Sequence, residues 1–87
     1  MLLGGFSITQ GWYYCTAAEY KIKHYGANLG GHAVVIAGYS DSEGGFIIEN
    51  QWGKCWGAKG FAIMPYDVFK KEFIYCAYMT NMLDNMD

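Results

Sequence analysis

Two apolar segments on either side of a short polar stretch constrain the fold of this chain more than any other feature. Ala33 to Ala37 is an uninterrupted apolar run rich in β-branched residues, which is typical of a buried strand. Phe46 to Asn50 has a similar character, and the polar stretch from Ser40 to Gly45 separates the two. Two strands joined by such a turn form a hairpin. We therefore expect an antiparallel hairpin in the middle of the chain.

Glycines and the single proline divide the rest of the chain into short elements. The predicted further strands are residues 2–8, 60–64 and 73–80, and the predicted loops are residues 26–31 and 53–59. A short helix is expected from Pro65 because proline is tolerated in a first turn. The segment from Gln10 to Tyr25 is ambiguous, but Trp12 and Ile22 fit a short helix. The sequence predicts a mainly β (α+β) fold: a small antiparallel β-barrel or sheet with one or two short helices, over residues 1–80. Residues 81–87 form a polar tail.

The balance of side chains indicates a surface that another protein covers. Hydrophobic residues make up 53% of the chain and charged residues only 16%, whereas about 25% charged residues is usual. The six basic residues are all Lys and form no stripe, which argues against nucleic acid as a partner. No apolar run approaches the roughly 20 residues of a membrane span, and the first residues do not resemble a secretory signal. We expect a protein partner and a location in the cytoplasm or inside a virion or other large assembly.

The three cysteines indicate neither a disulfide framework nor a metal site. Cys15, Cys55 and Cys76 are an odd number without a C-x-x-C pair, and His24 and His32 lack metal-ligand spacing. We therefore expect reduced thiols that behave as buried small hydrophobes, with no metal and no cofactor. His24, between a lysine and a tyrosine, is expected to be solvated.

Two stretches carry the strongest signal of function. They are Gly31-His32-Ala33-Val34-Val35-Ile36-Ala37-Gly38-Tyr39 and Asn50-Gln51-Trp52-Gly53-Lys54-Cys55-Trp56-Gly57-Ala58-Lys59-Gly60-Phe61. Together they resemble the second half of the papain-like cysteine peptidases, which has a His-Ala-Val strand followed by Asn-Ser-Trp-Gly-x-x-Trp-Gly. The segment Phe61 to Tyr66, with its Pro-Tyr ending, is similar to bacterial and phage-type members. Residues 31–66 carry the resemblance in detail, and residues 1–9 are similar to the strand that begins the second domain of that family.

The resemblance implies that His32 is the general base and acid, Asn50 the orienter of its ring, and Trp52 a shield over the contact between them. The chemistry agrees, because a thiol attacks only as thiolate and needs an imidazole to take its proton. Residues at the same end of paired strands can be neighbours although eighteen positions separate them. Taken singly, Asn50 would be a turn residue, Trp52 and Trp56 core aromatics, and the loop glycines positions of positive φ.

The nucleophile of the resembling family has no counterpart in this sequence. Only 31 residues precede His32, and they contain no glutamine and cysteine at the family's spacing. Cys15 lies within the expected second domain and is not assigned as the nucleophile. Two alternatives remain. In one, a second chain or segment supplies the cysteine and glutamine of a split or truncated peptidase. In the other, the chain is inactive and serves as an accessory or structural protein in a larger assembly. For the chain alone we favour this second alternative, because a missing nucleophile removes nearly all of the chemistry.

Overall fold

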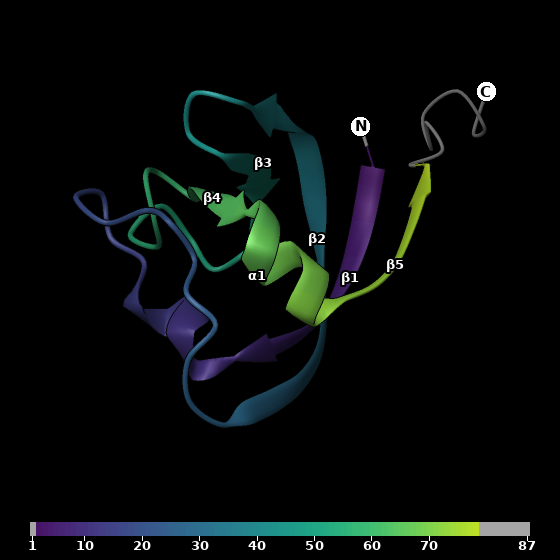
Figure 1. Cartoon of the computed structure of the whole chain (residues 1–87). Helices are drawn as coiled ribbons and strands as arrows, with labels where there is room; N and C mark the ends of the chain where they lie inside the picture. The colour runs from purple at the N-terminus through teal and green to yellow at the C-terminus, as the bar shows by residue number, and fades with distance from the viewer. Residues whose placement is uncertain (1, 79–87) are drawn as a thin grey trace, which may run out of the picture.

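The computed structural model describes residues 2–78, which form a five-stranded antiparallel sheet with a 3-10 turn and one short helix (Figure 1). In chain order the elements are β1 (Leu2–Thr9), η1 (Gln10–Tyr14), β2 (Asn28–Ser40), β3 (Gly45–Glu49), β4 (Phe61–Pro65), α1 (Tyr66–Glu72) and β5 (Phe73–Tyr78). Across the sheet the strands follow the order β4-β3-β2-β1-β5. The predicted mainly β class is confirmed. Residues 79–87, including the predicted tail, lie outside the described residues, so the boundary at residue 80 stays a prediction.

The predicted hairpin is formed by β2 and β3. Its register pairs Val35 with Glu49 and Tyr39 with Phe46, and the turn follows Ser40. The register shifts between Ile36 and Gly38, which is a bulge in β2. Local apolar runs and a polar turn were sufficient to predict this part of the fold.

The prediction of a loop over residues 26–31 is wrong for residues 28–31. β2 begins at Asn28, and its first residues pair with the end of β1, where Ser7 lies opposite Gly31. The glycine-rich stretch joins the sheet with a register shift between Ile8 and Thr9. Gly30 has a φ of 102°, which its lack of a side chain permits. Pairing with a strand some twenty residues earlier in the chain therefore overrides the local tendency of this glycine-rich stretch to form a loop.

The ambiguous segment from Gln10 to Tyr25 contains only the five helical residues of η1, followed by extended chain. This extended part lies beside β4, since the amide of Ile22 donates to the carbonyl of Ile63 and the amide of Ile63 donates to the carbonyl of Tyr20. Ile22 and Trp12 are both buried, as a core role requires. The segment thus covers the outer edge of β4 instead of forming a longer helix.

The core lies between the sheet and α1. In Figure 1 the sheet curls around α1, which contacts β4 and also β1, although these strands are not neighbours. Val68 of α1 packs into a cluster of buried side chains from the sheet and η1. Its other main members are Phe6, Ile8, Trp12, Val34, Ile36, Ile48 and Met64. No helix among residues 2–78 is long and apolar enough to cross a membrane.

Strand β5 is the edge of the sheet next to β1, and all six of its residues are exposed. Cys76 lies on this strand, so its prediction as a buried residue is wrong. Cys55 is also exposed, in the loop after β3, and only Cys15 is buried as expected. The apolar residues of Phe73 to Tyr78 predict burial, but an edge strand is open to solvent, and the sequence does not show which strand lies at the edge.

Candidate active site

Strand pairing brings His32 and Asn50 to the same face of the sheet. Because Val35 pairs with Glu49, Asn50 follows β3 at the position opposite Val34. His32 is two residues from Val34 along β2, so its side chain points to the same face. The two functional side chains are diagonal neighbours on adjacent strands, a spacing within reach of long side chains.

The Nε2 atom of His32 lies 2.8 Å from the Oδ1 atom of Asn50. The same oxygen accepts a hydrogen bond of 2.8 Å from the backbone N–H of Gln51. A backbone N–H can only donate, so this contact requires the carbonyl oxygen of Asn50, not its NH₂ group, to face His32. Nε2 must then carry the proton that it donates to Asn50, and in the neutral ring Nδ1 has a free lone pair. The arrangement gives His32 one nitrogen held by the protein and one free to accept a proton.

Aromatic rings enclose this hydrogen bond. The Trp52 ring stacks on His32 with centroids 5.0 Å apart, and Tyr13 stacks on Trp52 at 4.7 Å. Trp12 meets the His32 ring at 87°, with centroids 6.0 Å apart, and Trp56 stacks on Trp12 at 6.1 Å. Asn50 is itself 7% exposed. Trp52 stacks on His32, and its role as a shield that keeps water from the hydrogen bond stays a prediction.

The loop that carries Trp52 and Trp56 depends on its glycines, as expected. Gly53, Gly57 and Gly60 have φ angles of 91°, 60° and 90°. A Cβ atom on Gly57 would overlap the carbonyl oxygen of Phe61, so this position excludes side chains for two reasons. The N–H of Asn50 donates a hydrogen bond to the carbonyl of Gly60, which closes the loop, and the loop backbone thereby fixes the place of the two indoles.

Two open hollows flank His32 and Trp52. A hollow of about 270 Å³ is lined by Gly5, Phe6, Gly31, His32, Ala33, Ile74 and Tyr75. A hollow of about 380 Å³ is lined by Tyr13, Cys15, Trp52, Cys55 and Trp56. His32 thus borders one of these hollows, and Trp52 borders the other.

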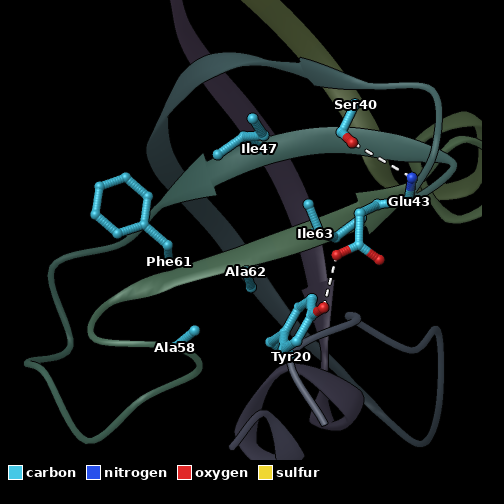
Figure 2. A pocket seen from close by; sticks show the side chains of 8 residues that line it. All are labelled: Tyr20, Ser40, Glu43, Ile47, Ala58, Phe61, Ala62 and Ile63. Carbon is cyan, nitrogen blue, oxygen red and sulfur yellow. Dashed lines mark hydrogen bonds between the residues drawn. The ribbon is translucent and has the colours of Figure 1, made fainter. Parts of the chain in front are cut away.

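A third hollow lies on β3 and β4, where Tyr20 and Glu43 meet (Figure 2). The Tyr20 hydroxyl donates to Glu43 at 2.6 Å, as the dashed line in Figure 2 shows. The volume of this third hollow is about 280 Å³. The hollow is lined by Tyr20, Ser40, Glu43, Ile47, Ala58, Phe61, Ala62 and Ile63. It shares no residue with the surroundings of His32, so it forms no part of the candidate active site.

None of the three cysteines is placed as a nucleophile for His32. Within the described part of the chain, His32 makes its side-chain hydrogen bond to Asn50 and none to sulfur. Burial raises the pKa of the Cys15 thiol to about 11, an effect that the charge of Lys23 only partly offsets. A thiol with that pKa is almost entirely protonated near neutral pH and is a poor nucleophile. This agrees with leaving Cys15 unassigned.

The expectation of a solvated His24 is wrong in part, because its ring reaches a buried carboxylate. The Nδ1 atom of His24 lies 2.7 Å from Oε2 of Glu72, whose side chain is fully buried. The same carboxylate accepts hydrogen bonds from Thr9 Oγ1 at 3.0 Å and from Trp12 Nε1 at 2.7 Å. Sequence reasoning missed Glu72, although its spacing of four residues from Val68 places it on the buried face of α1.

Among residues 2–78, no group of His, Cys, Asp and Glu has the geometry of a metal site. The hydrogen bond to Asn50 gives the candidate active site an oriented imidazole. Such a ring accepts a proton from a thiol and later returns it to a leaving group.

Comparison with known proteins places this geometry in a family. The family model of the papain family cysteine proteases matches residues 6–82. An uncharacterised peptidase C1-like protein of Acanthamoeba polyphaga mimivirus is 43% identical over 50 residues, covering 58% of this chain and 16% of that protein. The cathepsin B-like CP1 of Giardia intestinalis is 39% identical over 72 residues, covering 76% of this chain and 24% of its own length. Cathepsin K of Mus musculus is 46% identical over 35 residues, covering 38% of this chain and 11% of cathepsin K.

The chain thus spans less than a quarter of the length of these relatives. No solved structure matches it. The catalytic roles of His32 and Asn50, and the likeness to bacterial and phage-type members, stay predictions. Because the family model covers most of the sequence, the chain belongs to the papain family of cysteine proteases.

Proposed function

We propose that this chain supplies the base half of a thiol protease active site. His32 is the general base and acid, Asn50 orients its ring, and Trp52 shields the hydrogen bond between them. The cysteine and the glutamine of the oxyanion hole come from outside these residues, either from another part of a longer protein or from a second chain. The chain alone does not cleave peptides.

The observation that carries this proposal is the contact between His32 Nε2 and Asn50 Oδ1, with the amide orientation set by the N–H of Gln51. It leaves Nδ1 of His32 as the nitrogen available to a thiol. The thiol proton passes to Nδ1, and the thiolate adds to the substrate carbonyl carbon. The imidazolium then returns the proton to the amine that leaves, which yields a thioester. Water attacks the thioester with the same ring as base, and the thiol is restored.

A second candidate is an accessory role without catalysis, in which the apolar face binds a neighbouring subunit of a larger assembly. The observation in its favour is that no cysteine of the described residues lies against His32, while Ile74 and Tyr75 beside it are exposed. Both candidates require that a second chain, or another part of a longer protein, covers the face that contains His32 and Trp52. They differ in whether the covering part brings a nucleophile.

A chimera tests the proposal. Residues 2–78 replace the matching segment of an active papain-family protease, and hydrolysis of a fluorogenic peptide amide is measured. We expect a folded chimera to cleave, His32→Ala to abolish cleavage, and Asn50→Ala to lower kcat about tenfold or more, since misorienting a general base removes much of a 10²–10⁴-fold effect.

The isolated 87-residue chain is the matched control, and it should show neither turnover nor labelling by an epoxide inhibitor of cysteine peptidases. A folded chimera without activity would favour the accessory role. Stoichiometric labelling of Cys15 in the isolated chain, lost in His32→Ala, would contradict the proposal and make the chain a minimal protease.

A further inference from the structure

The buried carboxylate of Glu72 needs an explanation beyond stability. Its side chain is fully buried at the end of α1, and it accepts three hydrogen bonds, from Thr9, Trp12 and His24. Removing a carboxylate from water is costly even when it is paired, and an apolar side chain of similar size often stabilises a core as well or better. A charged group in this position is better explained by the orientation that it imposes on its donors.

Trp12 is the donor that connects Glu72 to the candidate active site. Its indole is completely buried, and its only polar atom, Nε1, lies 2.7 Å from Glu72 Oε1. Its ring contacts His32 at 6.0 Å and Trp52 at 6.2 Å between centroids. At the other end, the backbone carbonyl of Trp12 accepts a hydrogen bond of 2.6 Å from Nε1 of Trp56. Trp12 is therefore held at its indole N–H and at its backbone carbonyl, while its ring contacts the imidazole.

We propose that Glu72 is a positioning residue for the His32–Asn50 pair and acts through the indole of Trp12. The carboxylate holds Nε1 of Trp12, the indole confines the His32 ring, and the confined ring keeps Nε2 directed at Asn50. His24 lies on the outer side of the carboxylate, where its half-exposed ring closes the group off from solvent. This inference deepens the proposed function and rests on it, since a positioned imidazole has a purpose only where a thiol meets it.

The tautomer of His32 in the 87-residue chain is the readout. The chain has only two histidines, so ¹⁵N–¹H NMR correlations through the imidazole rings assign each one. In the wild type, His32 should be protonated at Nε2 and His24 at Nδ1. In Glu72→Leu, the ratio of Nε2–H to Nδ1–H forms of His32 should fall about fivefold, the effect of weakening one net hydrogen bond. Glu72→Gln keeps an acceptor for the indole and should retain the wild-type ratio.

Thr9→Val is the control, because it removes the hydrogen bonds of Thr9 Oγ1 with Glu72 and with the N–H of Tyr25 but keeps the bond from Trp12 to Glu72. It should lower the melting temperature and leave the His32 tautomer unchanged.

If Glu72→Leu does not fold, Trp12→Phe takes its place. This variant keeps an aromatic ring beside His32 and removes the N–H, so the ratio of His32 tautomers should fall in Trp12→Phe and not in Thr9→Val. A folded Glu72→Leu or Trp12→Phe with the wild-type ratio, or an equal change in Thr9→Val, would overturn the inference. The measurement needs no turnover, so its failure is distinct from failure of the chimera to cleave.

Discussion

The Nε2 atom of His32 lies 2.8 Å from the Oδ1 atom of Asn50, eighteen positions away in the sequence. Two features produce this contact: the register of β2 and β3, and the backbone N–H of Gln51, which turns the amide oxygen of Asn50 toward the ring. The NH₂ group of Asn50 is buried and has no hydrogen-bond partner among the described residues. An unpaired buried donor costs free energy. The position of the Asn50 side chain therefore gives its Oδ1 atom two hydrogen bonds and leaves its Nδ2 atom with none among the described residues.

Replacing Asn50 by alanine should free the His32 ring. We expect the preference of His32 for the Nε2–H tautomer to be lost, because the acceptor for that proton is gone. The free energy of unfolding should fall by only about 1 kcal/mol, since two hydrogen bonds to Oδ1 disappear together with the unpaired Nδ2 donor. ¹⁵N NMR of the imidazoles and chemical denaturation measure the two effects. His24, held by Glu72, is the internal control, and an unchanged His32 tautomer would contradict the assigned role of Asn50.

A glycine pair in the loop after Asn50 tests the geometry that holds Trp52 and Trp56. Gly57 and Gly53 both have positive φ, but only at Gly57 would a Cβ meet the backbone, whereas nothing lies within 4 Å of one at Gly53. Gly53→Ala should cost about 1–2 kcal/mol of unfolding free energy from its backbone conformation. Gly57→Ala should cost roughly 1–3 kcal/mol more from the overlap. Equal effects in thermal denaturation would show that the loop relaxes and does not fix the indoles.

The sequence predicted those parts of the molecule whose structure is decided locally. The β2–β3 hairpin follows from two apolar runs and a polar turn, and the neighbourhood of His32 and Asn50 follows from their places at the same end of that hairpin. Asn28 to Gly31 were predicted as loop because pairing with β1, distant in the chain, decides their conformation. Glu72 escaped notice for a similar reason. Its donors come from β1, η1 and the segment around His24, and only the folded chain brings them to one carboxylate.

The alkaline stability of the chain should contain a contribution from Cys15. Burial raises the pKa of its thiol from an ordinary 9.0 to about 11 in the folded chain. The unfolded chain therefore loses this proton at lower pH, so the contribution is fully present below about pH 9 and is lost as the pH rises through 11. Two pKa units correspond to roughly 2–3 kcal/mol.

Denaturation of Cys15→Ala and wild type at a series of pH values from 8 to 11 would reveal this term, because the difference in unfolding free energy between them should shrink as the pH rises. Cys76→Ala is the control, since Cys76 is exposed on β5 and its substitution removes no buried thiol. Alkylation at neutral pH should likewise modify Cys55 and Cys76 well before Cys15. Rapid alkylation of Cys15 would contradict its burial.

The isolated chain should associate with itself through β5. Among residues 2–78 no strand pairs with the outer edge of β5, and its side chains Ile74, Tyr75 and Tyr78 are 56%, 48% and 88% exposed. An apolar edge strand offers backbone donors and acceptors together with an apolar surface whose burial is favourable, so two copies can pair.

Ile74→Lys should weaken this association, because a charge on an edge strand opposes strand pairing. Tyr39→Lys is the control: Tyr39 is 67% exposed but lies on the inner strand β2, so its substitution should leave the association unchanged. Sedimentation velocity at micromolar concentration distinguishes the cases. A wild-type chain that sediments as a stable monomer and binds no hydrophobic dye would show that the exposed surface of β5 needs no partner. It would also remove the argument for a protein that covers this surface.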